Sequence, residues 1–472
     1  MRKACLLAGV ALVGLGVMVG PEARAETLEE VLATTYNTNP TLQARRARVR
    51  ASDENVPQAL SNWRPTVRFV GEAARGRYES NNSGNPPAYY DRETGRTGKS
   101  GTLTLSQPLY RGGRTVAETR QAEASVLSER AGLQATEQTQ LLAAATAFLN
   151  VVRDEAVLKL NINNEQVLRR QREAAEERFR VGEITRTDVS QAEARLARAI
   201  ADRVQAEGVL QNSRANFINV VGRAPESPEP PKAAVTVPAD LGEVKATTLA
   251  KNPNVLTSEW TAQAAKEGID LVAGELLPTV SLNGEYQRLL STTVRGGETE
   301  AMEATLQVSV PLYEAGDAYS RLRAQKHTYG QRRIEADQAR RDAIEAATQS
   351  WEDLQSARAR IKSFEAQIRA SEMALAGVEE EAKVGSRTVL DVLDAEQELF
   401  DARVSLVRAQ RDEMVAAFEL KSALGDMTAQ GLNLPVAVYD PVEHYEDVRG
   451  KWIGTGIDPQ PGYEDYAPAK SE

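Results

Sequence analysis

The chain has 472 residues, with 57 Lys and Arg against 67 Asp and Glu, a formal net charge of −10, and 5% aromatic against 26% charged residues. This mixture suits long solvated helices better than a large compact core, and its acidic balance makes nucleic acid a poor candidate partner. After residue 25 no stretch approaches the ~20 consecutive apolar residues of a membrane helix, which excludes a helical membrane protein. A β-barrel is not excluded, because its strands are short and alternating.

The first 25 residues have the pattern of a secretory signal peptide. Arg2 and Lys3 precede an apolar run, and Ala23 and Ala25 form a small-x-small cleavage site. The alternative, an N-terminal membrane anchor, requires a longer apolar run. The single cysteine, Cys5, lies inside this segment before the apolar run, so the mature chain is expected to carry no disulfide, thiolate metal site or lipidated cysteine.

The remainder consists of two copies of one unit, predicted over residues 26–222 and 244–428. Motifs of the first copy return after 252 − 39 = 213 residues up to the first strand and after 311 − 108 = 203 residues beyond it. A fixed offset over several motifs indicates an internal repeat. The matched pairs are Asn39-Pro40 with Asn252-Pro253, Pro65 with Pro278, Pro108-Leu109-Tyr110 with Pro311-Leu312-Tyr313, Val181-Gly182 with Val384-Gly385, Asp188 with Asp391, and Ala192-Glu193 with Ala395-Glu396.

Two further segments lie outside the copies. Residues 223–243 contain several prolines and predict an extended linker that cannot continue a helix. Residues 429–472 form a tail rich in Pro, Tyr and acidic residues, without a clear period. We expect this tail to lie on the surface or to be partly disordered.

Each copy predicts a short helix followed by two strands. Apolar and polar residues alternate with a period of two, as a strand with two different faces requires. The alternating apolar residues include Val67, Phe69, Leu103, Leu105, Val280, Leu282, Leu306 and Val308. A half-buried sheet of a soluble protein is the alternative, but the export signal, the length of each strand near ~9–11 residues and the polar loops at 76–100 and 288–300 favour strands that cross a membrane.

Aromatic residues near the strand ends support the same interpretation. Tyr78, Tyr110, Tyr286, Tyr313 and Trp63 stand where an interfacial girdle is expected. Four strands cannot close a barrel, and an open edge cannot persist in lipid. Two chains would give eight strands, which enclose little more than side chains, whereas three chains would give twelve, enough for an aqueous lumen. A channel therefore favours a trimer.

Long helices follow the strands in each copy. No proline occurs between Pro108 and Pro225 or between Pro311 and Pro435, and both stretches are rich in strong helix formers. The run Thr115–Phe179 predicts one helix, about 100 Å long at ~1.5 Å per residue. A seven-residue repeat in the second copy indicates coiled-coil packing. Its members are Leu354, Ile361, Ile368 and Leu375.

A turn interrupts the helices of each copy. Gly182 and Gly385 stand at the usual position of a C-terminal helix cap, each after a valine, Val181 or Val384. The segments Thr185–Asp188 and Thr388–Asp391 then fit the capping box that begins a helix. Each copy is thus predicted to end in a helical hairpin far from its strands.

On these residues the chain resembles the TolC family of outer-membrane efflux and export channels. The match covers about residues 27–428 and is strongest over 384–395, with a weaker copy at 181–193 and the Pro-Leu-Tyr of each return strand. The resemblance implies an α+β membrane channel in two structural repeats, whose three chains form a twelve-stranded barrel in the outer membrane and a helical tunnel in the periplasm. It implies a periplasmic adaptor (membrane fusion) protein, an inner-membrane pump (drug-proton antiporter or secretion ATPase) and outer-membrane lipid as partners.

The resemblance also implies a periplasmic gate at the second hairpin. Asp391 and Asp394 share a helix face, and threefold symmetry turns them into a ring of carboxylates that favours cations, is blocked by multivalent ones and raises the pKa of some members. Arg387 and Asp188 match the latch that ties this hairpin to its neighbour, whereas Ala382 stands where the family has an aromatic tie. Asp188 and Asp391 are alternatively capping acids worth ~0.5–2 kcal/mol each, an explanation that does not extend to Asp394.

Two other classes of protein are the alternatives. An enzyme is disfavoured because His327 and His444, the only histidines, stand in no nucleophile or metal pattern and are expected at the surface. The segment 111–114 is better explained as a strand-to-helix turn than as a phosphate loop, so no catalytic, cofactor or metal site is predicted. A soluble periplasmic coiled-coil scaffold or adaptor is disfavoured by the repeated strand pairs. The cargo, drugs or secreted proteins, stays open.

Overall fold

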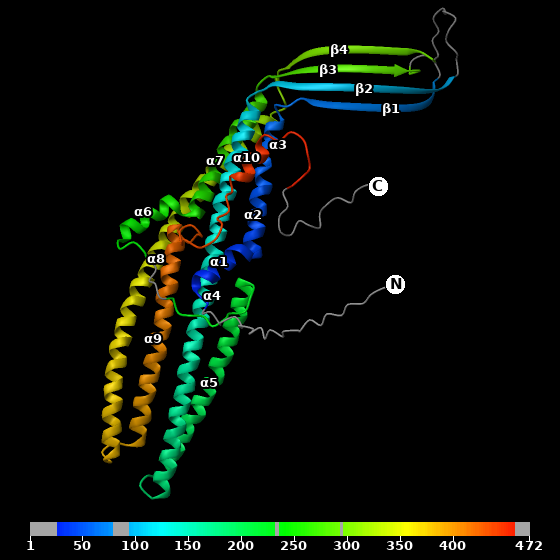
Figure 1. Cartoon of the computed structure of the whole chain (residues 1–472). Helices are drawn as coiled ribbons and strands as arrows, with labels where there is room; N and C mark the ends of the chain where they lie inside the picture. Colours follow the sequence, from blue (N-terminus) through cyan, green and yellow to red (C-terminus); the bar gives the residue numbers. More distant parts are fainter. Residues whose placement is uncertain (1–25, 79–93, 232–235, 293–295, 458–472) are drawn as a thin grey trace, which may run out of the picture. The chain divides into compact units, whose positions relative to one another are not determined.

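The structure, a computed structural model, describes residues 26–78, 94–231, 236–292 and 296–457, so the predicted signal peptide lies outside it. The chain divides into two compact units, and each unit draws segments from both sequence copies (Figure 1). The first unit takes the described parts of residues 1–39, 141–236 and 354–418. The second takes those of residues 40–140, 237–353 and 419–472.

The elements follow the predicted order twice. The first copy holds α1 (Leu28–Thr38), α2 (Pro40–Asp53), α3 (Asn55–Ser61), β1 (Thr66–Tyr78), β2 (Thr94–Arg111), α4 (Arg114–Arg180) and α5 (Arg186–Val221). The second copy holds α6 (Leu241–Lys251), α7 (Pro253–Ala273), a short 3-10 helix η1 (Gly274–Leu276), β3 (Thr279–Leu290), β4 (Glu298–Ser309), α8 (Asp317–Lys383) and α9 (Val389–Leu424), and the tail adds α10 (Glu443–Arg449).

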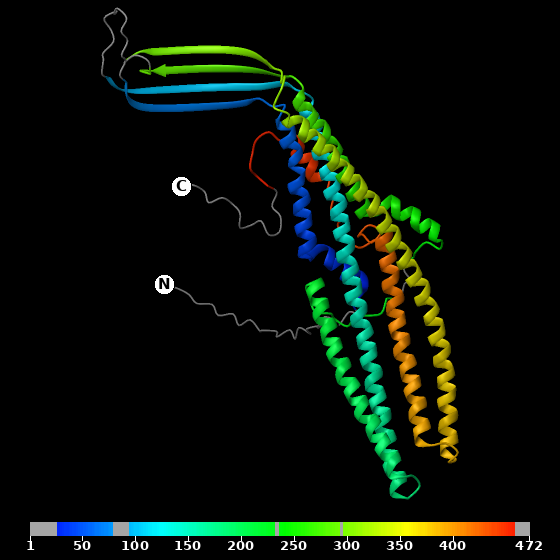
Figure 2. The same cartoon turned by 180° about the vertical axis from the view of Figure 1, so that it is seen from behind.

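The four strands form one antiparallel sheet in the order β1-β2-β3-β4, and the two sequence copies meet at β2 and β3 (Figure 2). Directly paired residues project from the same face of a sheet. The predicted apolar residues fall on one such face, through the pairs Val67–Leu105, Phe69–Leu103, Leu282–Leu306 and Val280–Val308, and through Leu103–Tyr286 across the centre. The predicted alternation is therefore confirmed.

The strands are longer than the sequence pattern predicts. Loops were expected over residues 76–100 and 288–300, but the strands that flank them enter both ranges. Backbone pairing needs no apolar side chain, so the ladder continues through polar residues past the alternating segment. The observed limits are Tyr78 for β1, Thr94 for β2, Leu290 for β3 and Glu298 for β4.

A tight turn joins β2 to α4, as predicted for residues 111–114. Gly112 and Gly113 both have positive φ, 66° and 76°, a conformation that disfavours residues with a Cβ. At Gly112 a Cβ would lie 2.2 Å from the carbonyl oxygen of Gly274, so the close approach of two backbones also requires glycine there. Just before the turn the register of β2 shifts between Pro108 and Tyr110, because proline has no N–H for the ladder.

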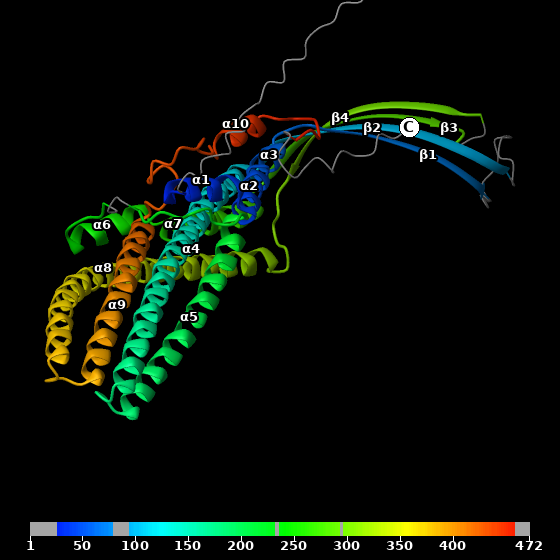
Figure 3. The same cartoon turned by 60° about the horizontal axis from the view of Figure 1, so that its bottom comes forward.

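The predicted long helix of the first copy is α4, with 67 residues, and α8 has the same length. The heptad residues lie on the less exposed side of α8, with Leu354 buried and Ile361, Ile368 and Leu375 partly buried. In the first unit, α9 lies beside α4, where Arg411 Nε donates to Asn150 Oδ1 at 2.9 Å (Figures 1 and 3). Among the helices that the structure describes, none combines the length and apolar character needed to cross a membrane.

In both copies the asparagine of the repeated Asn-Pro motif donates a hydrogen bond to a carbonyl near the end of a long helix. Asn39 Nδ2 donates to the carbonyl of Val220 at 3.1 Å, near the end of α5, and Asn252 Nδ2 donates to the carbonyl of Ala423 at 3.0 Å, near the end of α9. The last carbonyls of a helix have no partner within the helix, so each asparagine satisfies one of them.

The part of the tail that the structure describes, residues 429–457, contains a helix that its composition did not predict. Within the second unit, α10 packs on α2 and α3 (Figure 2). His444 Nδ1 lies 3.1 Å from Oδ2 of Asp53, whose side chain is fully buried. The expectation that His444 is an ordinary surface residue is therefore wrong, because a buried carboxylate requires a polar partner.

Candidate functional site

The two helical hairpins of the first unit end in nearly identical turns (Figure 3). Gly182 has φ 81° and Gly385 has φ 77°, the left-handed conformation of a C-terminal helix cap. In the first turn the N–H of Glu183 donates to the carbonyl of Arg178 at 2.9 Å, and in the second the N–H of Ser386 donates to the carbonyl of Glu381 at 3.0 Å. Both turns therefore close as the sequence predicts.

Both predicted capping boxes are present. The Oδ2 atoms of Asp188 and Asp391 accept from the backbone N–H of Thr185 and Thr388, each at 2.9 Å, and also from the hydroxyls of these threonines. The hydrogen bonds from Thr185 lower the pKa of Asp188, and those from Thr388 lower the pKa of Asp391. In this single chain both carboxylates thus act as caps and are held in their charged form.

Asp394 has a different environment. Its Oδ1 lies 2.5 Å from Nη2 of Arg195, so the first turns of α9 are tied to α5 by an ion pair. The side chain of Asp394 is 56% exposed and that of Arg195 is 28% exposed. The role of Arg195 could not be predicted from the sequence, because the two residues are 199 positions apart and no local pattern connects them.

The two predicted latch residues have partners within their own hairpins. Arg387 Nε donates to Glu381 Oε2 at 2.9 Å, and this carboxylate raises the pKa of Arg387. The carboxylate of Asp188 accepts its capping hydrogen bonds from Thr185. In the described part of one chain no contact joins Arg387 to Asp188, so the latch stays a prediction about neighbouring chains. Ala382, the position of the missing aromatic tie, is only 7% exposed.

An apolar core supports the site from behind. Leu393, between the two candidate ring residues, packs with residues of α4 and α5, and it is only 1% exposed. The buried partners are Leu168, Ala175, Ala192, Leu196 and Ala199. This packing fixes the rotation of α9, and the carboxylate of Asp394 consequently points away from the core.

One more carboxylate of the second hairpin, Glu396, has a shifted pKa. Burial raises the pKa of Glu396, and the nearby carboxylate of Glu379 on α8 raises it further. Glu396 stands two residues after Asp394 on α9. The second hairpin therefore contains Glu396, whose charged form is disfavoured, close to Asp391, whose charged form is stabilised.

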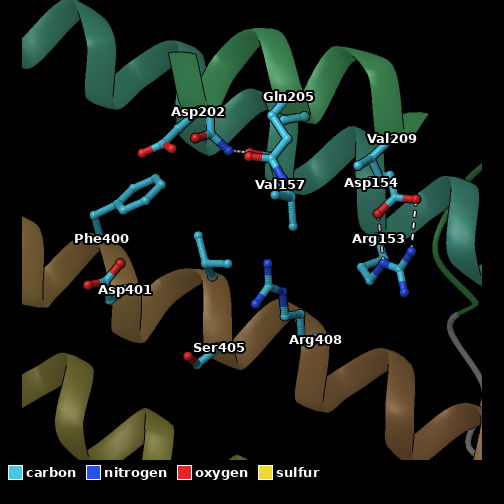
Figure 4. Close-up of a pocket in the computed structure, with 13 residues that line it drawn as sticks. Arg153, Asp154, Val157, Asp202, Gln205, Val209, Phe400, Asp401, Ser405 and Arg408 are labelled. Carbon is cyan, nitrogen blue, oxygen red and sulfur yellow. Dashed lines mark hydrogen bonds and ion pairs between the residues drawn. The ribbon is translucent and has the colours of Figure 1, made fainter. Parts of the chain in front are cut away.

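A cavity of about 510 Å³ lies farther along the same unit, lined by α4, α5 and α9 (Figure 4). Arg153 forms a bidentate ion pair with Asp154, at 2.7 and 2.9 Å, and Ser213 donates to the same aspartate. Asp202, Asp401 and Arg408 complete its charged lining. Mixed charges without a paired nucleophile and base are typical of a solvated groove between helices rather than of a catalytic centre.

Within the described residues no cluster of three or more His, Cys, Asp or Glu side chains is placed to hold a metal ion. His327 is exposed on α8.

An amphipathic sheet with open edges, joined to long helical hairpins with charged tips, defines a class of protein: membrane channels with a helical extension. The family model described as "Outer membrane efflux protein" matches residues 31–223 and 246–426. The chain belongs to this family. It is an outer-membrane channel that provides an export path.

Individual relatives agree. The outer membrane efflux protein BepC of Brucella suis is 35% identical over 457 residues, which are 96% of this chain and 97% of that protein. The outer membrane protein TolC of Escherichia coli is 24% identical and covers 90% of this chain and 87% of its own. The crystal structure of the outer membrane protein VceC of Vibrio cholerae has a TM-score of 0.73 at 21% identity, covering 84% of this chain and 96% of that one.

These likenesses confirm the predicted fold class, that of the TolC-like channels, which are homotrimeric. They also confirm the predicted outer-membrane location and the general export function. The family and the fold are those of channels rather than enzymes.

Proposed function

We propose that three copies of this chain form a passive export conduit whose periplasmic end is closed by the α8–α9 hairpins and opens when a periplasmic adaptor and an inner-membrane pump engage it. The edge strands support the trimer. Apolar side chains on β1 and β4 are widely exposed in the single chain, with Phe69 71% and Leu306 62% exposed. Pairing of β1 with β4 of a neighbour closes the sheet, as lipid requires, and three chains leave a lumen.

The gate is the second hairpin, with Asp391 and Asp394 as the ring that faces the opening. The observation that carries this assignment is the buried Leu393, which packs on the side of α9 away from the two acids and so directs them out of the core. Three chains bring six carboxylates to a narrow end, where a ring of negative charge concentrates cations and binds multivalent ones. Arg195 pairs with Asp394 in each chain and reduces the net charge of that ring.

The latch between neighbouring hairpins is Arg387 with Asp188. Both groups are charged and stand at the tips, where hairpins of adjacent chains meet in a closed bundle. In a closed trimer Arg387 would leave Glu381 or bridge Glu381 and Asp188, since a guanidinium has five donors. Opening then requires only that surface ion pairs exchange, and because exposed ion pairs contribute little to stability, adaptor binding can supply the cost.

The conduit role requires a pump partner. A passive channel needs an energised partner in the inner membrane, and the relative BepC, an outer membrane efflux protein, supports an efflux pump in this position. Cross-linking and pull-down of the intact trimer from membranes identifies this pump. A secretion ATPase in place of a drug-proton antiporter would redirect the proposal to secreted proteins.

Planar-bilayer conductance tests the ring. The Asp391→Ala/Asp394→Ala protein is expected to lose most of its block by a trivalent cation, because the ring carboxylates bind it. The matched control is Gln191→Ala/Glu193→Ala, which removes a carboxylate from the corresponding helix of the first copy and leaves the latch residue Asp188 in place. Unchanged block in the first variant, or an equal loss in the control, would contradict the ring.

A further inference from the structure

After α10, within the second unit, the chain exposes two neighbouring apolar residues. Trp452 is 66% exposed and Ile453 is 89% exposed, directly after α10. Such residues are seldom left in water side by side without a function. The proposed gate involves neither of them.

Contacts fix Trp452 near the first residue of β1. The guanidinium of Arg64, two residues before that strand, lies 4.8 Å from the centroid of the Trp452 ring, and its Nη1 donates to the carbonyl of Lys451 at 2.7 Å. Trp63 also lies at this end of the sheet, because Gln107 Nε2 of β2 donates to its carbonyl at 2.8 Å. A shallow hollow of about 490 Å³ is lined by both tryptophans.

The segment that carries Trp452 is firmly held. Tyr445 and Arg449 both bond to Glu123 of α4, at 3.3 and 3.0 Å. Arg130 lies 3.6 Å from the buried Asp53 and stacks on Tyr445, 5.0 Å from its centroid. The position of Trp452 is therefore a property of the fold and not of a free chain end.

This position coincides with one surface of the membrane. β1 and β3 begin and β2 and β4 end on the side of the sheet that leads into helices, so that side is the periplasmic rim of the membrane-spanning strands. Trp63 belongs to the predicted girdle at this rim, and its side chain is 40% exposed. Tryptophan prefers the headgroup level of a bilayer, where its ring meets lipid chains and its N–H meets polar groups.

We propose that Trp452 and Ile453, with Trp63 beside them, form an interfacial anchor that inserts into the periplasmic leaflet of the outer membrane. The ligand is phospholipid, since the anchor is continuous with the strands that already contact lipid. Arg64 and Lys451 border the tryptophan and suit the phosphate of a headgroup. The anchor gives the tail a role: it clamps the helices α2, α3 and α4 at a fixed depth below the bilayer.

The inference rests on the outer-membrane location and is independent of the gate. Two other environments are possible for Trp452 in the assembled protein, water and the surface of a neighbouring copy. Fluorescence of a single tryptophan distinguishes all three, since lipid-borne and aqueous quenchers report different surroundings.

The test uses the intact trimer in vesicles of phosphatidylethanolamine and phosphatidylglycerol. The Trp63→Phe/Trp260→Phe/Trp351→Phe protein retains Trp452 alone. Its emission is expected to lose roughly half its intensity when lipids brominated near the headgroup replace ordinary ones, and to resist aqueous acrylamide, as an interfacial ring would. The matched control retains only Trp260 of α7, which stands 273 − 260 = 13 residues before the end of that helix, ~20 Å away from the strands along its axis. The control is expected to respond to acrylamide and not to bromine.

Each other result overturns the proposal. Quenching of Trp452 by acrylamide without an effect of bromine places the tail in water. Protection of Trp452 from both acrylamide and brominated lipid would show that a neighbouring copy of the chain covers it. If the triple variant does not assemble, the difference in emission between the unaltered protein and Trp452→Phe supplies the same measurement.

Discussion

Arg178 of the first helical hairpin and Glu381 of the second occupy equivalent positions, 381 − 178 = 203 residues apart, and carry opposite charges. Each pairs across its turn, Arg178 with Glu183 at 2.7 Å and Glu381 with Arg387 at 2.9 Å. The backbone of both turns is the same, down to the left-handed glycine and the capping box. The two hairpins thus share an architecture while their surface chemistry differs.

The difference extends to the helices that follow. Asp394 of α9 has Gln191 as its counterpart in α5, so only the second hairpin carries an acid three residues after its capping aspartate. A cap needs one carboxylate, and the additional one is therefore available for another purpose. The glycine and the capping aspartate, which both copies share, therefore form the turn, whereas Asp394, which only the second copy has, adds a charge to it.

The largest expected effect concerns Arg195. In Arg195→Ala, each chain of the trimer frees the carboxylate of Asp394, and three freed charges at a narrow opening attract a trivalent cation strongly. We expect block of the channel at about tenfold lower cation concentration, a change of ~1.4 kcal/mol. Single-channel conductance measures it. Arg198→Ala is the control, because Arg198 pairs with Asp202 on its own helix. Equal block in Arg195→Ala and the unaltered channel would show that the ion pair does not set the charge of the gate.

The next effect concerns the latch. Arg387→Ser removes the cation from the second turn and is expected to raise resting conductance several-fold, because the closed hairpins lose a tie. Arg178→Ser removes an arginine from the first hairpin and should leave conductance unchanged. A channel that stays closed in Arg387→Ser would remove the latch from the mechanism.

A smaller and equal effect is expected in the two turns. Gly182→Ala and Gly385→Ala each place a Cβ at positive φ, with no neighbour within 4 Å to clash, so the cost is conformational and about 1 kcal/mol. Gly377→Ala, inside α8 and equally unobstructed, should instead stabilise by ~0.4–1 kcal/mol. Thermal denaturation of the detergent-solubilised trimer measures all three. Unequal losses of stability in Gly182→Ala and Gly385→Ala would show that the shared left-handed backbone is not the main determinant of the stability of these turns.

The smallest effect is a pH dependence confined to the second hairpin. The folded-state pKa of Glu396 is raised above its ordinary value of 4.5, so its contribution to stability is fully present below that value and is lost as pH rises through the raised pKa. Asp391 has the opposite sign, since its lowered pKa gives stability above 3.8 that is lost as pH falls through the folded-state value. The protection factors of residues 379–396, which are exchange rates corrected for the intrinsic effect of pH, should therefore rise as pH falls through the raised pKa of Glu396. Glu396→Gln should abolish that change; persistence of the full change in this variant would assign it elsewhere.

Features defined by neighbours in the chain could be predicted from the sequence. The turns at Gly182 and Gly385, the two capping boxes and the length of α4 follow from local residue types, because helix caps and helix propensity act within a few residues. The repeat offset gave the element order, and the alternation at Leu103 and Leu105 gave the faces of the sheet. Strand ends were misjudged, since backbone pairing continues where the side-chain pattern stops.

Features that join distant segments could not be predicted. The pair Arg195–Asp394 depends on how α9 packs against α5, and Leu393 sets that packing through a core drawn from three helices. The burial of Asp53 beside His444, and the placement of Trp452 beside Arg64, depend on where the tail returns, 391 and 387 residues along the chain. By itself the sequence determined which elements form and which family they build, because these depend on local propensity and period. Only the tertiary structure decided which charges are paired and which apolar residues are exposed, because pairing and exposure are set by contacts between segments that the order of residues does not make adjacent.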